Sequence, residues 1–408
     1  MALNALYVDF NSYFASVEQQ LVPELRGKPV GVVAVMAETT CCIAASYEAK
    51  AFGIKTGTGV RDARKLCPNI VFVQARPPVY VALHHELIEI VESCTHVEKV
   101  LSIDEMVCTL TGSQQQPENA LKLAAKIKRA IRKRYDYIRC SIGIAPNTFL
   151  AKTASNMQKP DGCVLIEQHE LPQRLFHLKL RDLNGIGKQM EARLNRYKIT
   201  TVEQLYAANR QQLQTAWGSI EGERMYDKLR GLEPYYIKNA RSSLGHSHVM
   251  PPEQRNEAGV RAVLHRLLQK ACMRMRSYEL LASKISVKVK FRDCPSWHME
   301  SAISATDSTL RLTEALETFL QHYPKTQHEP YAVGVNFSGL LTADEVARDL
   351  FQVEPLENEK KLSQAIDTLN LKFGKNTIYF GGAHDALKDA PMRIAFNHIP
   401  DLKVEGDT

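Results

Sequence analysis

The chain lacks any apolar stretch long enough to cross a bilayer. A membrane-spanning helix needs about 20 consecutive apolar residues, so we expect no membrane span and no membrane partner. The first residues, Met1 to Leu6, contain no basic segment, and Asp9 interrupts the apolar run early. We therefore expect no secretory signal peptide and a cytoplasmic location.

Paired cysteine motifs are also absent. The nine cysteines include no Cys-x-x-Cys pair and no cysteine–histidine spacing typical of zinc ligands. Their odd number and their scatter argue against a disulfide framework and favour reduced thiols in a cytosolic protein. Cys41 and Cys42 are neighbours, and we interpret them as small buried apolar residues rather than as a redox or metal site.

Neither sign of charge dominates the chain. The 52 Lys and Arg residues exceed the 45 Asp and Glu residues by seven, a basic bias that is compatible with nucleic acid but does not establish it. The composition is that of a globular protein, and 408 residues are more than one hydrophobic core usually holds. We therefore expect two to four domains.

The most informative feature that is present is a set of three carboxylates at the ends of two apolar runs. Asp104 and Glu105 follow one run, and Asp9 follows the run from Leu3 to Val8. Both runs predict short buried strands, and if these pair, the three acids meet at one sheet edge. Clustered acids are costly unless a cation neutralises them, and oxygen ligands suit Mg²⁺ or Mn²⁺. Two such ions about 3.5–4 Å apart serve in-line displacement at phosphorus, so the pattern points to phosphoryl or nucleotidyl transfer.

Changes of pattern along the chain predict an α+β multidomain fold. A basic helix is predicted from Ala120 to Arg134, within the region 77–166, and we interpret its basic face as a solvated surface. The expected segments are a strand at 1–10, an α/β insertion at 11–76, a helix–strand–helix–strand region at 77–166, an all-helical region at 167–232, a linker at 233–243, a β-α-β-β-α-β module at 244–340 and a tail at 341–408.

A glycine-containing turn lies within the all-helical region, at Leu183 to Lys188. Its apolar-x-Gly-Ile-Gly pattern between two predicted helices resembles the helix-hairpin-helix DNA-binding motif. Glycines allow main-chain N–H groups to approach a phosphate at a helix N-terminus. We therefore predict DNA contacts at Gly185, Gly187 and Lys188, and a plain turn between helices is the alternative.

One predicted strand of the later module, Ser283 to Arg292, alternates strictly between apolar and basic residues. The alternation predicts one buried face and one face of lysines. A row of lysines on an open sheet face suits a phosphate backbone, whereas the alternative is protection of an edge strand from aggregation. The predicted DNA-binding lysines are Lys284, Lys288 and Lys290.

Five ordered motifs resemble those of the Y-family translesion DNA polymerases, the group that includes bacterial DNA polymerase IV and the catalytic subunit of polymerase V. The resemblance extends from residue 1 to about residue 340 and implies a right-hand polymerase. Palm (1–10 and 77–166), fingers (11–76), thumb (167–232) and little finger (244–340) would follow one another. The motifs are Val8–Glu18, Ser46–Gly53, Leu101–Glu105, Ser141–Lys152 and Met157–Gly162.

The resemblance also implies roles for individual residues. Asp9 and Asp104 would bridge two Mg²⁺ ions, for which Mn²⁺ can substitute. Glu105 would complete this site, and the main-chain carbonyl of Phe10 would bind the ion that accompanies the nucleotide. Phe14 occupies the position of the steric gate, a ring that excludes a ribose 2′-hydroxyl, and a core aromatic is the alternative. The implied nucleotide ligands are Phe14, Tyr13, Tyr47, Lys50 and Lys159.

The nucleotide site departs from the polymerase IV pattern at two positions. That pattern has Thr three residues before Tyr47 and Arg three residues after it, whereas this chain has Ala44 and Lys50. Lysine keeps the charge but loses the bidentate fork of arginine, and alanine lacks a hydroxyl donor. Nucleotide affinity is then weaker unless other groups compensate. The stretch after Tyr47 is closer to the polymerase V subunit, and the stretch from Lys159 is closer to polymerase IV.

The implied partners are primer–template DNA, dNTPs and the sliding clamp, and we expect a bacterial monomer that associates with the nucleoid when bound to DNA. The clamp peptide resembles Gln-Leu-x-Leu-Phe. The chain offers Leu350 and Phe351 in a stretch without the glutamine. A chance Leu-Phe pair at a helix end is the alternative.

Two other functions stay open at this point. A non-catalytic Y-family relative could serve as a DNA-bound scaffold, although the retained acids disfavour it. A palm-type nucleotidyl cyclase also has paired acids on a βαβ-like core, but it needs neither the glycine turn nor the lysine face. A template-directed polymerase of low fidelity, without a proofreading nuclease, is the favoured prediction.

Overall fold

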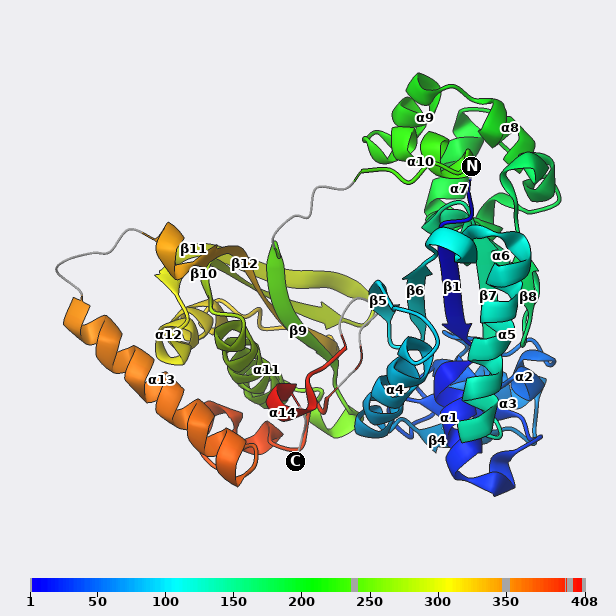
Figure 1. Ribbon diagram of the computed structural model, residues 1–408. Helices are drawn as coiled ribbons and strands as arrows, with labels where there is room; N and C mark the ends of the chain where they lie inside the picture. The colour runs from blue at the N-terminus through cyan, green and yellow to red at the C-terminus, as the bar shows by residue number, and fades with distance from the viewer. Residues whose placement is uncertain (1, 236–240, 347–352, 393, 395–398, 406–408) are drawn as a thin grey trace. The chain divides into compact units, whose positions relative to one another are not determined.

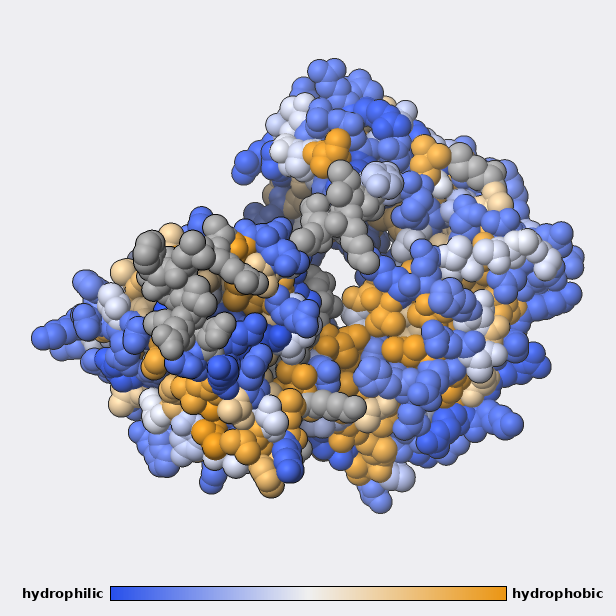
Figure 2. Space-filling model, turned by 60° about the vertical axis from the view of Figure 1, so that its left-hand side comes forward, coloured by the Kyte–Doolittle hydropathy of each residue, from blue (hydrophilic) through white to orange (hydrophobic). Residues whose placement is uncertain are grey.

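The computed structural model describes residues 2–235, 241–346, 353–392, 394 and 399–405. The chain divides near residue 236 into two compact units (Figure 1). Across the described ranges, no helix combines the length and the hydropathy that a membrane span requires. The surface shown in Figure 2 is mainly hydrophilic, and its hydrophobic side chains lie in scattered groups.

A five-stranded mixed sheet forms the centre of the first unit. Its elements are β1 Ala5–Phe10, β5 Lys99–Ser102, β6 Glu105–Thr109, β7 Cys140–Ala145, β8 Cys163–Leu165, α4 Pro77–Glu92, α5 Pro117–Arg134 and α6 Thr148–Met157. The strand order is β5-β6-β1-β7-β8, with β1 antiparallel to both neighbours and β7 parallel to β8. Helices α4 and α5 pack against each other, and α6 packs on β7 and β1.

All six residues of β1 are buried, as expected for a central strand that is covered on both faces. The strand begins and ends two residues later than the apolar run Leu3 to Val8 suggested. Asp9 therefore lies inside the strand instead of after its end, and the neighbouring strands fix the direction of its side chain.

The start of α6 explains the predicted break after β7. The side chain of Asn147 caps this helix by accepting a hydrogen bond from the N–H of Leu150 at 2.8 Å. Its amide nitrogen donates to the carbonyls of Lys228 and Leu232 at 2.9 and 2.8 Å. One buried side chain thus positions α6 and ties it to the all-helical region.

The segment between β1 and α4 forms a second, smaller sheet. Its elements are α1 Tyr13–Leu21, β2 Val30–Val33, β3 Cys42–Ala45, α2 Tyr47–Lys50, α3 Val60–Leu66 and β4 Val71–Gln74. The strand order is β3-β2-β4, and α1 packs on β2 and β3. Cys42 lies in the core of this sheet, as predicted, but Cys41 is exposed, so the prediction that both are buried is wrong for Cys41. Cys41 lies one residue before the start of β3 and therefore outside the core of the sheet.

The all-helical region contains α7 Lys188–Arg196, α8 Val202–Ala207, α9 Arg210–Trp217 and α10 Glu221–Leu229. Leu194, Leu205 and Leu213 form a core that continues into α6. The element before the glycine turn is a 3-10 helix, Leu180–Asp182, instead of the α-helix that we expected. Its three residues are too few for an α-helical ladder.

The second unit confirms the predicted β-α-β-β-α-β order. Its elements are β9 Ser243–Val249, α11 Glu257–Ser277, β10 Leu280–Phe291, β11 Cys294–Thr306, α12 Thr309–Leu320 and β12 Pro330–Thr342. The strand order is β11-β10-β12-β9, with every neighbouring pair antiparallel. Helices α11 and α12 cover one face of this sheet, where they share its apolar core.

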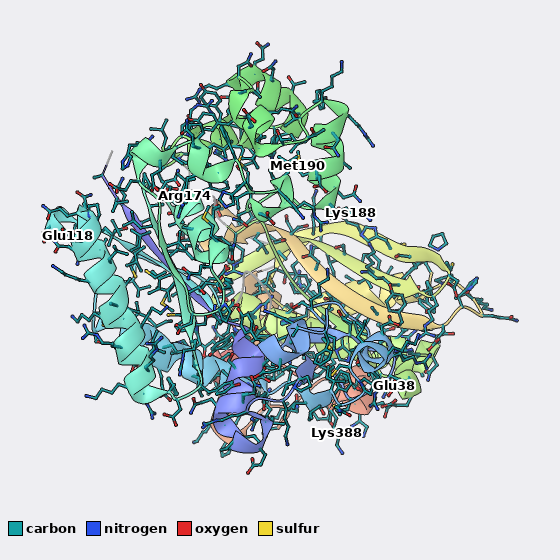
Figure 3. The ribbon with its side chains drawn as sticks, turned by 90° about the vertical axis from the view of Figure 1, so that its right-hand side faces the viewer. Glu38, Glu118, Arg174, Lys188, Met190 and Lys388 are labelled. Atoms are coloured by element: carbon teal, nitrogen blue, oxygen red, sulfur yellow. The ribbon has the colours of Figure 1, made fainter. Side chains whose placement is uncertain are left out.

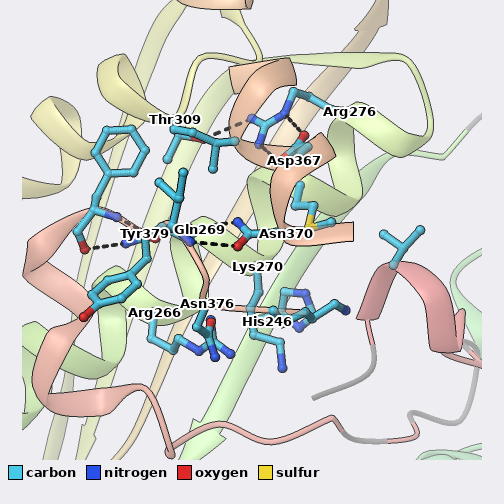
Figure 4. Close-up of a pocket in the computed structure, with 16 residues that line it drawn as sticks. His246, Arg266, Gln269, Lys270, Arg276, Thr309, Asp367, Asn370, Asn376 and Tyr379 are labelled. Carbon is cyan, nitrogen blue, oxygen red and sulfur yellow. Dashed lines mark hydrogen bonds and ion pairs between the residues drawn. The ribbon is translucent and has the colours of Figure 1, made fainter. Parts of the chain in front are cut away.

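Part of the predicted tail packs on α11. It contains α13 Val353–Phe373, the 3-10 helix η8 Gly381–Ala386 and α14 Leu402–Glu405. Arg276 of α11 donates to both carboxylate oxygens of Asp367 in α13, at 2.6 and 2.8 Å (Figure 4). Gln269 exchanges two 3.1 Å hydrogen bonds with the main chain of Phe380.

Candidate active site and DNA-binding surface

The three predicted acids lie at one end of the five-stranded sheet. Asp9 in β1 is directly opposite Glu105, the first residue of β6. Asp104 lies in the two-residue turn between β5 and β6, and the Phe10 N–H donates to its carbonyl at 2.8 Å. Asp104 and Glu105 thus do not end the strand that precedes them: a tight hairpin puts one in a turn and the other on the returning strand.

Each acid has a polar partner. Lys159 donates to Asp9 at 2.6 Å, and Lys152 of α6 donates to Glu105 at 2.9 Å. The Ser102 hydroxyl donates to Asp104 at 2.6 Å. Sequence reasoning assigned no role to Lys152, although it lies in the quoted motif Ser141–Lys152. Only the packing of α6 on the sheet shows which acid it reaches.

Burial disfavours the ionised forms of Asp9 and Asp104. It raises the pKa of Asp9 to about 6, although the ammonium group of Lys159 acts in the opposite direction. Burial also raises the pKa of Asp104, against the hydrogen bond from Ser102. A further cation at this site would favour both carboxylates in their ionised form.

The donor set fits a hard divalent cation, because it consists of carboxylate and carbonyl oxygens. Asp9 and Glu105 contact lysines here, and no three Asp, Glu, His or Cys side chains in the described ranges are already gathered for metal binding. Each of these lysine hydrogen bonds engages one oxygen of its carboxylate, Oδ2 of Asp9 and Oε2 of Glu105.

The loop that carries Lys159 is held by the basic helix α5. Lys128 donates to the carbonyl of Gly162 at 3.0 Å and to the carboxylate of Asp161 at 2.9 Å, and Arg132 also pairs with Asp161. Asn11 accepts a hydrogen bond from the Asp161 N–H at 2.7 Å. The interpretation of the basic face of α5 as merely solvated is therefore wrong for Lys128 and Arg132, since tertiary packing brings an acid to them.

The predicted nucleotide residues gather beside Asp9. The ammonium group of Lys50 lies 4.4 Å from the ring centroid of Tyr47 and donates to the Ser12 hydroxyl at 2.6 Å. Burial raises the pKa of Tyr47 to about 12 and lowers that of Lys50, and Lys159 acts on Lys50 in the same direction. The structure thus brings together Tyr47, Lys50 and Lys159 around one carboxylate.

The two aromatic residues that start α1 have different environments. Tyr13 is buried, and its hydroxyl donates to the carbonyl of Tyr80 at 2.7 Å. Phe14 is half-buried and stacks on the ring of Tyr80, with centroids 4.5 Å apart and planes at 17°. Phe14 is therefore not a fully buried core aromatic.

A cleft extends from Asp104 and Glu105 along one face of β6 and β1 to the helical region. Palm residues Tyr7, Glu105 and Lys152 line it together with Gly185 and Trp217 from the helical region. Gly185 has φ +90°, a conformation that favours glycine, whereas Gly187 is the N-cap of α7. Leu183 and Ile186 anchor the turn, and its polar residues, including Lys188 (Figure 3), are exposed. The residues that start α7 are exposed.

The lysine face of the second unit is confirmed on β10. Lys284, Lys288 and Lys290 are exposed, and the alternate apolar side chains are buried. Strand β10 pairs with both β11 and β12, so edge-strand protection is wrong as an explanation. On β12 the residues opposite these lysines are small, namely Ser338, Gly334 and Ala332, and on β11 Ala302 lies opposite Lys284 and His298 opposite Lys288.

The proposed clamp residues Leu350 and Phe351 lie outside the described residues.

Comparison with known proteins agrees with this architecture. The impB/mucB/samB family matches residues 8–156, and the C-terminal domain of that family matches residues 241–350. The thumb domain of DNA polymerase-iota matches residues 181–233. DNA polymerase IV of Moorella thermoacetica is 32% identical over 387 residues, which cover 92% of this chain and 94% of the relative. DNA polymerase IV of Pelotomaculum thermopropionicum is 30% identical, with 91% and 93% covered.

Solved structures show the same fold. A Y-family DNA polymerase chimera of Dbh and Dpo4 has a TM-score of 0.71 at 24% identity, covering 83% of this chain and 99% of the other. An insertion ternary complex of Dbh DNA polymerase has a TM-score of 0.56 at the same identity and coverage.

The chain belongs to the impB/mucB/samB family, the Y-family DNA polymerases. It resembles DNA polymerase IV and is a DNA-directed DNA polymerase of the translesion class.

Proposed function

We propose that Asp9, Asp104 and Glu105 form the centre at which this polymerase joins a dNTP to a primer 3′-hydroxyl. The β1–β6 register carries this proposal, because it sets two of the acids opposite each other and the third in the adjoining turn. The carbonyl of Phe10 is the proposed main-chain ligand. Two Mg²⁺ or Mn²⁺ ions bound there would lower the pKa of the primer hydroxyl and offset charge on the phosphates.

Tyr47, Lys50 and Lys159 would hold the nucleotide triphosphate, with Tyr13 beside them. Two of them are lysines close to Asp9, which supports an anion site next to the acids. When the triphosphate binds, Lys159 would exchange the Asp9 carboxylate for a phosphate oxygen. Asp9 would then become available as a ligand, which couples nucleotide binding to completion of the site.

Phe14 would be the steric gate against ribonucleotides. Its half-buried ring and its place in the first turn of α1, five residues after Asp9, support this role. A rigid ring below the sugar rejects an added hydroxyl by contact. The hypothesis predicts that Phe14→Ala admits ribonucleotides, and single-nucleotide incorporation tests it.

Primer–template DNA would contact two surfaces. The glycine turn of the thumb offers N–H groups at Gly185 and Gly187 and the charge of Lys188. The open face of β10 offers three exposed lysines. The limits proposed for palm, fingers and thumb stay as predicted, whereas β9 begins at Ser243 and β12 ends at Thr342, so the proposed little finger extends slightly beyond 244–340 at both ends.

Several finer properties follow from the family alone. Low fidelity, no proofreading, action as a monomer in the bacterial cytoplasm and association with the nucleoid are part of the proposal. Clamp binding through Leu350 and Phe351 is also proposed, and a pull-down with both changed to alanine tests it.

The non-catalytic scaffold has no support from the comparisons, and intact acids argue against it. The thumb match and the coverage of DNA polymerase IV relatives also disfavour the cyclase.

Primer extension with the full chain tests the proposal. The templates would be undamaged and abasic, with Mg²⁺ or Mn²⁺, and the test variant would be Asp104→Ala, Glu105→Ala. A matched control, Glu89→Ala, Asp136→Ala, removes two exposed palm acids instead. Extension should vanish only in the test variant. Equal extension by both variants, or none by the unchanged protein while it still binds DNA, would contradict the assignment.

A further inference from the structure

The ring behind Phe14 is held by a buried carboxylate. Tyr80, which stacks on Phe14, is fully buried, and its hydroxyl donates to Glu18 at 2.7 Å. Arg76 donates to both oxygens of the same carboxylate, at 3.1 and 2.5 Å. Glu18 is 1% exposed. Its charge is therefore balanced by one guanidinium and hydrogen-bonded by one phenol.

Helix geometry shows that the Glu18–Arg76–Tyr80 cluster joins two helices. Phe14 and Glu18 lie four residues apart on α1, so they occupy the same face. Arg76 is the N-cap of α4, and Tyr80 lies four residues later on that helix. The stack and the ion pair are thus the two ends of one contact surface, and they fix the rotation of α1 relative to the start of α4.

A buried carboxylate is a costly way to join two helices. Removing the Glu18 carboxylate from water is costly, although the side chain of Arg76 stays 42% exposed, and apolar residues of similar volume often pack as stably. What the charged cluster adds is direction. The bidentate arginine fixes the carboxylate, which fixes the phenol, and an apolar contact would allow the ring to shift.

We propose that Glu18 and Arg76 are positioning residues for sugar discrimination, since they hold Tyr80 so that its ring sets how far Phe14 can retreat from the nucleotide sugar. The inference rests on the proposed role of Phe14 as the gate. Glu18 and Arg76 touch neither nucleotide nor metal in this proposal. Their effect reaches the sugar only through the two stacked rings.

Two substitutions weaken the Glu18–Arg76–Tyr80 cluster without removing the stacking of Tyr80 on Phe14. Tyr80→Phe deletes only the hydroxyl, and Glu18→Gln replaces the carboxylate by an isosteric neutral group. A matched control is Tyr135→Phe. Tyr135 donates to Glu86 at 2.7 Å, and Arg134 donates to the same carboxylate, so this trio has the same chemistry but joins α4 to α5.

The measurements are kcat and KM for a dNTP and for the matching rNTP, together with thermal unfolding of each variant. Loss of one buried hydrogen bond corresponds to a factor of about 2–10. We expect the preference for dNTP to fall by about that factor in Tyr80→Phe and Glu18→Gln, through a higher kcat/KM for the rNTP. The dNTP values should change less, and Tyr135→Phe should keep the full preference.

Phe14→Ala separates failure of the inference from failure of the gate. If Phe14→Ala admits rNTP while Tyr80→Phe and Glu18→Gln keep the full preference for dNTP, the proposed gate stands and the inference is overturned. If Tyr80→Phe and Glu18→Gln lower kcat/KM equally for dNTP and rNTP, together with lower thermal stability, the cluster is structural only and the inference is again overturned. If Phe14→Ala itself keeps the preference for dNTP, the proposed gate is wrong, and the inference that rests on it is overturned as well.

Discussion

Gly143 in β7 is a position where a very small change in the sequence should have a large effect on the site. A Cβ added there would lie well under 3.0 Å from the main-chain oxygen of Ala151 and the main-chain nitrogen of Ser155. Both atoms belong to α6, whose backbone cannot rotate away as a side chain can. Gly143→Ala therefore pushes α6 off the sheet.

The magnitude follows from overpacking and backbone entropy. Overpacking a dense core costs about 1–3 kcal/mol and occasionally more, and clashes with two main-chain atoms place this case at the upper end. The smaller entropy of the unfolded alanine chain returns about 0.4–1 kcal/mol. We expect a net loss of about 2–3 kcal/mol, or ~4–12 °C in Tm for a unit of this size. Because α6 carries Lys152 and leads to Lys159, primer extension should fall as well.

Thermal and urea unfolding of the full chain measure this effect, with Gly59→Ala as the matched control. At Gly59, φ is −61° and the added Cβ would meet only Asp62, at an ordinary 3.5 Å. The control should stay within about 1 kcal/mol of the unchanged protein, since it loses only glycine's cap preference. A Gly143→Ala protein as stable and as active as the control would refute the reasoning, because α6 would then have to yield without cost.

Three further predictions follow from the contacts. Neutralising Lys284, Lys288 and Lys290 of β10 should weaken primer–template binding. In a salt titration the slope of log K against log salt should fall by about 3. An unchanged slope would place the DNA elsewhere. Asp367→Asn should destabilise the second unit by about 2–4 kcal/mol, because it leaves the mostly buried Arg276 without its charge partner, and unfolding followed by Trp297 fluorescence measures this. Burial alone would raise the pKa of Glu48, but hydrogen bonds, including that from Tyr137 at 2.7 Å, lower it. The ionised form therefore stabilises the fold above the unfolded pKa of about 4.3, and this is lost as the pH falls through the lower folded pKa. Glu48→Gln should thus cost stability at pH 7 and progressively less as the pH falls below the unfolded pKa of about 4.3, and a cost independent of pH would contradict this sign.

Local sequence patterns were sufficient for features that depend on neighbours along the chain. Alternation over Ser283 to Arg292 predicted which residues of β10 are buried, because side chains of a strand point to opposite faces in turn. The Gly-Ile-Gly turn predicted a break with exposed glycines. The acids Asp9, Asp104 and Glu105 stood out because clustered carboxylates are costly unless a cation neutralises them.

Contacts between distant segments could not be predicted in this way. The pairing of Lys152 with Glu105 and of Lys128 with Asp161 requires α6 and α5 to lie on particular strands. The edge-strand alternative for β10 needed the sheet order to exclude it. The tail packs on α11 through Asp367, a residue whose pattern along the chain does not distinguish it from a solvated acid.

The sequence by itself determined the acids, the lysine face, the glycine turn and the β-α-β-β-α-β order of the second unit, because each depends on chain periodicity and residue chemistry. The helix–strand–helix–strand prediction for 77–166 was incomplete, because it missed the hairpin of β5 and β6 and the elements α6 and β8. Only the tertiary structure decided the partners: which lysine neutralises which acid, and that Glu18 and Arg76 close on Tyr80 behind Phe14. The physical reason is that a charge buried in a fold must be balanced by whichever group the packing brings to it, and the chain separates those groups by up to 150 residues.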